Sequence, residues 1–202
     1  MTANILPTLQ HLAGVKVAVA LYTNPELIAI EMKLNWFSWN FIHEQYAREK
    51  VSYCALPEML QEKVVSIMKT LSSERNKWLL YHGEFFGYDI YKINNLWNSL
   101  GVIDRFETAK RLVECEDLKL KDRFKFACYY GIRKKVKQLW KKLSLKERKE
   151  LENESHVFQH YSELAACDSL EPERSLMYIG EWIEWLKNGV GVRSPPFSYS
   201  RL

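Results

Sequence analysis

Residues 122–131 read DRFKFACYYG and residues 132–143 read IRKKVKQLWKKL, and this stretch decides the fold. Apolar residues recur at spacings of three and four in both halves, so each half is expected to be a helix with one apolar stripe. Gly131 lies between the halves and adopts a positive φ at little cost, which lets the chain reverse there. The stretch therefore predicts a helical hairpin whose apolar stripes are Phe124, Ala127, Cys128, Val136, Leu139, Trp140 and Leu143.

An earlier segment is similar to the second half of this hairpin. Residues 93–100 read INNLWNSL and align with VKQLWKKL at residues 136–143, 43 residues further along. We therefore expect a helix over residues 88–100 that carries Trp97, with Gly101 just past its end. A spacing of this size falls in the range of two- and three-helix repeats, so the pattern indicates hairpins that stack on one another.

The composition favours an all-α chain. Of the 202 residues, 47% are hydrophobic, and seven Trp, eleven Tyr and nine Phe supply large packing surfaces. Eight Gly and six Pro are few, which argues against a β-rich or disordered chain. No alternation of strand period is long enough to build a sheet. We expect short connectors between helices that form a bundle of stacked hairpins or a short α-solenoid.

Helix start and stop signals divide the chain into elements. The first helix is expected from Pro7 to Tyr22. Asn24 caps a second, longer helix that begins at Pro25, whose apolar stripe reaches Ile42 before it decays into the polar residues 44–50. The Ser144–Glu147 capping box opens a charged helix, followed by a separate apolar-striped helix. The other helices are expected to begin at or near Pro57, Ser72, Tyr88, Asp104, Asp122, Ile132 and Pro172.

The same signals suggest three regions. Residues 1–72 form an N-terminal helical region, and residues 73–188 form the region of helical hairpins. Residues 189–202 contain Gly-Val-Gly and Ser-Pro-Pro and lack any periodic apolar pattern, so we expect a tail there.

The hairpin resembles the helix–turn–helix core of an ankyrin repeat. The resemblance rests on residues 126–131 and on Val136, Lys137 and Leu139, and it covers about 20 residues. Asp122-Arg123-Phe124 departs from the usual Thr-Pro-Leu-His start of that family. The 43-residue spacing is also longer than an ankyrin repeat. The overall pattern is similar to a group of helical arthropod proteins, a resemblance that implies no activity.

A second resemblance concerns the N-terminal helix. Residues 9–13 read LQHLA and, with Val17, are similar to the elongin-binding helix of a SOCS box. Leu56-Pro57 corresponds to the downstream cullin-contacting pair, whereas Ala13 stands where that family usually has Cys. The resemblance implies a ubiquitin-ligase adaptor. The alternative interpretation is that this is an ordinary core helix, and the residues in question are Leu9, Leu12, Ala13 and Val17.

Residues with the chemistry for catalysis or metal binding are sparse. His156 and His160 share one helix face, a spacing that two zinc ligands can use, but no third ligand can be assigned. The sequence has no phosphate-binding Gly loop, Gly-x-Ser-x-Gly elbow or Cys/His catalytic signature. We therefore expect a protein that is not an enzyme and needs no cofactor or metal.

Several features suggest an intracellular protein outside the membrane. The four cysteines are widely separated, the N-terminus lacks the pattern of a secretory signal peptide, and the apolar run at residues 15–21 is too short to span a bilayer. The expected location is intracellular, most simply the cytoplasm, with reduced thiols.

A basic run follows the Gly131 turn. Residues 133–149 contain nine basic residues and one acid, Glu147, in a chain whose net charge is only +4. The run is consistent with a solvated helix face, with a surface for an acidic protein, or with phosphate contacts to nucleic acid. Nucleic acid is the least favoured because acidic residues at 150, 152 and 154 follow at once and are expected to neutralise part of the charge. The candidate interaction residues are Arg133, Lys134, Lys135, Lys137, Lys141 and Lys142.

The sequence thus supports two main hypotheses. In the first, the chain is a non-enzymatic scaffold that binds another protein through its stacked hairpins. In the second, it is a ubiquitin-ligase substrate adaptor that docks through its N-terminal helix.

Overall fold

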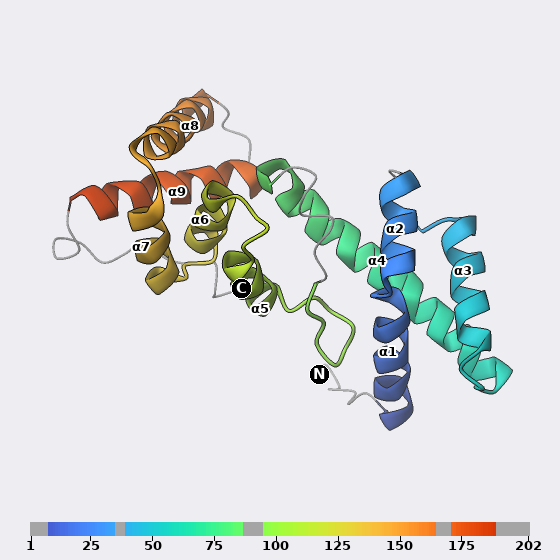
Figure 1. Ribbon diagram of the computed structural model, residues 1–202. Helices are drawn as coiled ribbons and strands as arrows, with labels where there is room; N and C mark the ends of the chain where they lie inside the picture. The colour runs from blue at the N-terminus through green and yellow to red at the C-terminus, as the bar shows by residue number, and fades with distance from the viewer. Residues whose placement is uncertain (1–7, 35–38, 87–94, 165–170, 189–202) are drawn as a thin grey trace, which may run out of the picture. The chain divides into compact units, whose positions relative to one another are not determined.

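The computed structural model describes residues 8–34, 39–86, 95–164 and 171–188, which are almost entirely helical (Figure 1). Their only β-type pairing is a single antiparallel bridge between Trp97 and Ile103. The all-α prediction is therefore confirmed. The described chain divides into two compact units: unit 1 comprises residues 1–80 and 90–104, and unit 2 comprises residues 81–89 and 105–202.

Unit 1 is built from four helices. They are α1 (Leu9–Tyr22), α2 (Pro25–Leu34), α3 (Phe41–Ser52) and α4 (Glu58–Phe86), of which α4 belongs to unit 1 as far as Leu80. Helix α1 packs against α3, and apolar side chains of both helices share one core with those of α4. The resulting core comprises Ala18, Tyr22, Leu27, Tyr46, Ala47, Val51, Val64, Val65, Met68 and Leu71.

The first helix boundary is as predicted. Helix α1 ends at Tyr22, and the side-chain oxygen of Asn24 accepts a hydrogen bond of 2.9 Å from the backbone N–H of Glu26 at the start of α2. An Asn side chain in this position satisfies a backbone donor that has no partner within the helix.

Two predicted boundaries in unit 1 are wrong. The long second helix is in fact two helices, since Asn40 caps α3 through its side-chain oxygen, which accepts from the N–H groups of Ile42 and His43. Conversely, the helix break expected at Ser72 does not occur, and Ser72 is a buried residue inside α4. The point at which the sequence analysis divided the N-terminal helical region from the hairpin region, between residues 72 and 73, also lies inside α4.

The prediction of a helix around Trp97 is also wrong for the described residues 95–100. Trp97 lies on an extended segment that pairs with Ile103 around a turn in which Gly101 has a φ of 77°. The side-chain oxygen of Asn98 accepts hydrogen bonds from the N–H groups of Leu100 and Val102, at 2.9 and 3.1 Å. Such bonds offer the backbone an alternative to a helix. The similar sequences around Trp97 and Trp140 therefore do not form the same structure in their described residues.

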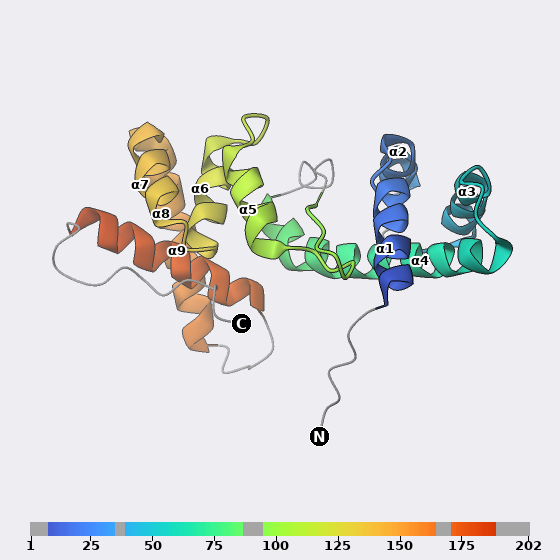
Figure 2. The same cartoon turned by 90° about the horizontal axis from the view of Figure 1, so that it is seen from below.

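Unit 2 contains α5 (Arg105–Glu114), α6 (Leu120–Tyr129), α7 (Arg133–Lys142), α8 (Leu145–Leu164) and α9 (Glu171–Lys187). Helices α5, α6 and α7 lie side by side in Figures 1 and 2, and α9 packs against α6 and α8. The central helix α6 buries five of its ten residues, which are Phe124, Phe126, Ala127, Cys128 and Tyr129.

The α6–α7 hairpin is confirmed. Gly131 has a φ of 61°, and the N–H of Ile132 donates to the carbonyl of Ala127 at 2.8 Å to close the end of α6. All predicted stripe residues of the hairpin are buried except Trp140, which is half-buried and contacts Phe124 with 5.4 Å between ring centroids. The stacking of further hairpins into a solenoid stays a prediction.

The end of α4 packs into unit 2 through His82. This buried side chain lies between the rings of Phe126, Tyr129 and Tyr130, and its Nε2 is 2.9 Å from the hydroxyl oxygen of Tyr130. His82 therefore helps to complete the aromatic core that α6 begins.

The capping box at Ser144 is confirmed, but the two helices expected after it are one. The N–H of Ser144 donates to the carboxylate of Glu147 at 2.8 Å, and the N–H of Glu147 donates to the Ser144 hydroxyl at 3.2 Å. Helix α8 then continues from Leu145 to Leu164 without a break. The expected tail at 189–202 lies outside the described residues.

We predict opposite effects of alanine at two glycines. Gly131→Ala forces a side chain into a left-handed conformation and should lower the free energy of unfolding by about 1 kcal/mol. Gly180→Ala should raise it by roughly 0.5–1 kcal/mol, because Gly180 lies within α9 and a Cβ there meets Ser155 at an ordinary contact distance of 3.5 Å. Urea unfolding followed by circular dichroism measures both. A stabilised Gly131→Ala variant would contradict the turn geometry.

Candidate functional site

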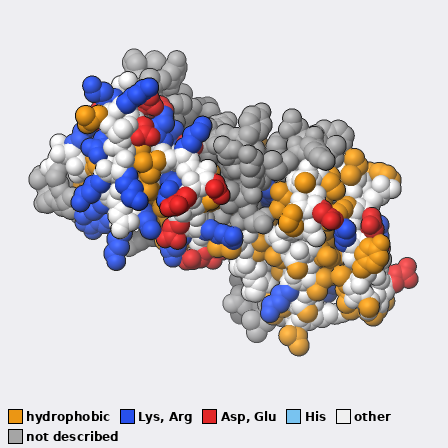
Figure 3. Space-filling view, viewed as in Figure 1, with side chains coloured by type: hydrophobic (Ala, Val, Ile, Leu, Met, Phe, Trp, Pro, Cys, Tyr) orange, Lys and Arg blue, Asp and Glu red, His pale blue; other side chains and the backbone are white. Residues whose placement is uncertain are grey.

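Helix α7 carries a dense set of cations on its outer side. Six of its ten residues are basic and none is acidic, while Val136 and Leu139 are buried on its inner side. Lys134, Lys141 and Lys142 are exposed. Figure 3 shows Lys and Arg side chains gathered over the part of unit 2 where α7 and α8 lie. We call the six basic residues of α7 the basic face: Arg133, Lys134, Lys135, Lys137, Lys141 and Lys142.

The acidic residues of α8 do not neutralise this face, contrary to the expectation from their position in sequence. Glu150 pairs with Lys121 of α6 at 2.6 Å, and Glu154 pairs with Lys125 of α6 at 2.6 Å. Glu152 pairs with Lys187 of α9 at 2.9 Å. These three acids therefore belong to ion pairs with helices other than α7.

The pKa values agree with these contacts. The hydrogen bond and charge of Lys121 lower the pKa of the Glu150 carboxyl, and the same hydrogen bond raises the pKa of the Lys121 ammonium group. Glu147 is engaged by its capping box, since hydrogen bonds from the side chain and backbone of Ser144 lower its pKa. Each of these acids thus has a defined local role away from the basic face.

Among the described ion pairs, only one involves the basic face. Lys135 contacts Glu114 of α5 at 2.9 Å, and this contact lowers the pKa of the Glu114 carboxyl. The other five residues of the face have no acidic partner in the described part of the chain, and they are Arg133, Lys134, Lys137, Lys141 and Lys142.

Two of these cations share one aromatic ring. The guanidinium carbon of Arg133 lies 5.2 Å from the centroid of the Trp185 ring, and the ammonium nitrogen of Lys137 lies 5.1 Å from it. Trp185 belongs to α9 and is only 5% exposed. In the same way, Arg148 of α8 lies 4.9 Å from the ring of the half-buried Trp140. Cation–π contacts of this kind attract charged groups to the ring by about 0.5–1 kcal/mol at exposed sites.

The sequence-predicted adaptor residues differ in exposure, and Val17 packs against the core of unit 1. The buried residues of this helix are Val15, Ala18 and Tyr22, a different face from the one expected to form the core. Leu9 is 84% exposed. Ala13 is also exposed, and Leu12 and Val17 are half-buried. The apolar stripe from Leu9 to Val17 is therefore a poor predictor of burial here, because α1 is apolar around most of its circumference.

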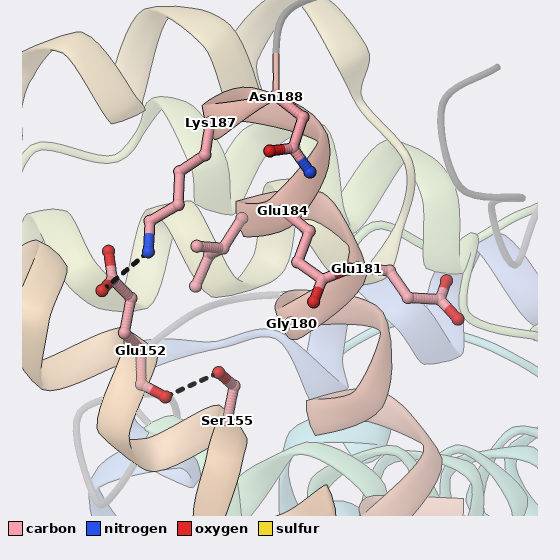
Figure 4. A pocket seen from close by; sticks show the side chains of 8 residues that line it. Glu152, Ser155, Gly180, Glu181, Glu184, Lys187 and Asn188 are labelled. Atoms are coloured by element: carbon pink, nitrogen blue, oxygen red, sulfur yellow. Dashed lines mark hydrogen bonds and ion pairs between the residues drawn. The ribbon is translucent and has the colours of Figure 1, made fainter. Parts of the chain in front are cut away.

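A separate cleft of about 310 Å³ lies between α8 and α9. Figure 4 shows Lys187 of α9 reaching Glu152 of α8, with the hydroxyl of Ser155 donating to the backbone oxygen of Glu152. Burial, with a smaller effect from Glu184, raises the pKa of the Glu181 carboxyl. Its acidic lining and its ion pair make this cleft a polar contact between two helices, and no chemistry beyond that follows from it.

The described residues hold no group of His, Cys, Asp and Glu that could bind a metal ion. His156 and His160 fall on α8, but their side chains lie outside the described residues. Cys54, Cys115 and Cys128 are free thiols, and burial raises the pKa of Cys128 well above its ordinary value. No described helix has the length and apolar character that crossing a membrane requires.

Comparisons with known proteins assign no relatives. No protein-family model matches the chain, and neither a curated protein nor a solved structure is significantly similar to it.

The sequence identified the basic residues but missed what makes them a defined site. The sequence did not single out Trp185, which lies three residues after Trp182 and packs against it in an edge-to-face contact of 5.3 Å. The spacing of Arg133 and Lys137 by one helical turn was a usable signal, because residues at i and i+4 project to the same side of a helix.

We predict that the basic face lowers the stability of α7 at its beginning. Lys134 stands in the first turn, where the helix dipole disfavours cations, and this turn contains no acid. Lys134→Glu should therefore raise the free energy of unfolding by about 0.3–1 kcal/mol. Lys141→Glu is the matched control, since it makes the same charge change in the last turn and should lower stability by a similar amount. Equal effects of the two substitutions in urea unfolding at low salt would contradict this account.

Proposed function

We propose that the chain is a non-enzymatic interaction module that binds an acidic segment of another protein through the basic face. The observation that supports the proposal most directly is the direction of the acidic side chains of α8. Glu150, Glu152 and Glu154 pair with lysines of α6 and α9, so five cations of α7 remain without an acidic partner among the described residues. An acidic partner would supply the missing counter-charges.

The basic face lowers the stability of α7, and this also supports a role in binding. Three cations occupy the positive end of α7, and like charges along one helix repel each other. Residues that lower the stability of their own helix are typical of functional surfaces, where activity and stability are in conflict. The charge pattern is thus better explained by a partner than by solubility alone.

Two features favour a protein over a nucleic acid as that partner. Single-stranded nucleic acids are bound by aromatic rings on which bases stack, but the two rings near the face, Trp140 and Trp185, are already in contact with Arg148, Arg133 and Lys137. Duplex binding through phosphates alone weakens steeply with salt. We therefore expect association with nucleic acid to be lost near physiological salt.

The proposal is tested with a fluorescein-labelled peptide rich in Glu, measured by fluorescence anisotropy at physiological salt. The chain should bind it, and the Lys134→Gln/Lys141→Gln/Lys142→Gln variant should lose the binding. The matched control is Lys16→Gln/Lys69→Gln/Lys77→Gln, which removes the same charge from exposed sites of unit 1 and should bind normally.

Three outcomes would contradict the proposal. They are the absence of binding, an equal loss in the two triple variants, and tighter binding of a DNA duplex than of the peptide at physiological salt. A Gln-rich peptide of the same length controls for contacts that do not depend on charge.

A specific observation keeps the adaptor hypothesis as a second candidate. Three of the four residues that resemble an elongin-binding helix keep apolar surface outside the core, since Leu9 and Ala13 are exposed and Leu12 is half-buried, whereas Val17 packs against the core. Figure 3 shows hydrophobic side chains spread over the visible face of unit 1. Apolar residues left on the surface are common at sites of protein association.

Binding to purified elongin complex tests this second candidate. In a pull-down, the chain should retain elongin, whereas Leu9→Ser/Leu12→Ser should reduce retention strongly because it removes apolar surface from the contact. Lys16→Gln on the same helix is the control and should have no effect. If the unaltered chain retains no elongin, the adaptor hypothesis is wrong.

A further inference from the structure

The strongest local feature of the basic face is the pair formed by Arg133 and Lys137 over Trp185, which we call the Trp185 cation pair. The two residues are separated by one helical turn of α7, and both lie about 5 Å from the same ring of α9. Neither has an acidic partner among the described residues, so two positive charges lie near one ring without an acidic counter-charge from that part of the chain. Like charges brought together in this way repel each other.

The ring explains how the pair is held in place. Trp is the aromatic side chain with the strongest attraction for cations, and Trp185 is itself almost completely buried. Arg133 is exposed and Lys137 is half-buried. Arg133 is therefore accessible to a ligand, and the attraction of its guanidinium group to the ring favours positions close to that ring. Restricting a side chain in advance lowers the entropic cost of binding.

The chemistry of the pair indicates which group fits it. An Arg guanidinium presents parallel N–H donors that match the oxygens of a carboxylate or phosphate, and a neighbouring Lys adds a second positive charge. A phosphomonoester carries a charge of about −1.5 to −2 at neutral pH, whereas a single carboxylate carries one negative charge. Two unpaired cations at one ring thus match a phosphomonoester more closely than a single carboxylate.

We propose that the Trp185 cation pair anchors the partner by binding the phosphomonoester of a phosphorylated serine or threonine side chain, in preference to a single carboxylate. This inference rests on the proposed binding of an acidic protein segment to the basic face. Lys134 and Lys141 neighbour the pair along the helix, so acidic residues that flank the phosphorylated side chain would meet them.

Three peptides that differ at one central residue test the proposal. The flanking residues are acidic in all three, and the centre is Ser, Glu or phosphoserine. Anisotropy titrations should show phosphoserine binding about tenfold more tightly than Glu, because charge-assisted hydrogen bonds to phosphate are stronger and more numerous. Equal affinities for the Glu and phosphoserine peptides would overturn the proposal.

Single substitutions show which residues cause the preference for the phosphoserine peptide. Arg133→Gln and Lys137→Gln should reduce the ratio of phosphoserine to Ser affinity, whereas Lys134→Gln and Lys142→Gln remove the same charge outside the pair and should leave that ratio unchanged. Arg133→Lys retains the charge but loses the planar donors, so it should weaken the phosphoserine complex more than the Glu complex. A purely structural role of Arg133 would change the affinity for all three peptides alike, and that result would overturn the proposal.

The controls separate this inference from the proposed function. If all three peptides bind equally and depend only on Lys134, Lys141 and Lys142, the basic face is an acidic-protein site and the phosphate preference is wrong. If none binds, the proposed function itself fails.

Inorganic phosphate lacks the flanking contacts and should displace the phosphoserine peptide only in large excess. Displacement by an equimolar amount would show that the pair is a site for free phosphate instead. Circular dichroism of each variant confirms that it is folded.

Discussion

Helix α6 is the element on which the rest of unit 2 depends. Its apolar side is buried against α5, α7 and α9, with Phe124, Phe126, Ala127 and Cys128 almost wholly excluded from solvent. Its polar side carries Lys121 and Lys125, which take Glu150 and Glu154 of α8 as partners. One ten-residue helix therefore sets both the packing of unit 2 and the direction in which the acidic side of α8 points.

This second effect connects the fold to the proposed function. In sequence, three acids follow the basic run directly and are expected to neutralise part of its charge. In the folded chain, the acids are used between α8 and its other neighbours, and the cations of α7 are left on the outside. Local charge, rather than the modest net charge of +4, is the quantity relevant to a partner.

Features set by neighbouring residues could be predicted, and features set by distant contacts could not. The Asn24 cap, the Ser144–Glu147 capping box and the Gly131 turn depend on residues within one helical turn, and all three are as expected. The Trp97 segment is an exception among the local features. Its apolar spacing was compatible with a helix, but hydrogen bonds from the nearby residues Leu100 and Val102 to Asn98 favour a turn. The basic residues of the site were visible in the sequence, but their contact with Trp185, about 50 positions away, was not.

A pair of double-mutant cycles that share Glu150 tests the central claim most directly. Glu150 lies one helical turn after Lys146 of its own helix and yet pairs with Lys121 of α6. At neutral pH, above the lowered pKa of Glu150, urea unfolding should give a larger coupling energy for Lys121→Gln/Glu150→Gln than for Lys146→Gln/Glu150→Gln. A larger coupling for the Lys146 cycle would show that α8 uses its acids to neutralise the basic run itself, and it would remove the main support for an acidic partner on α7.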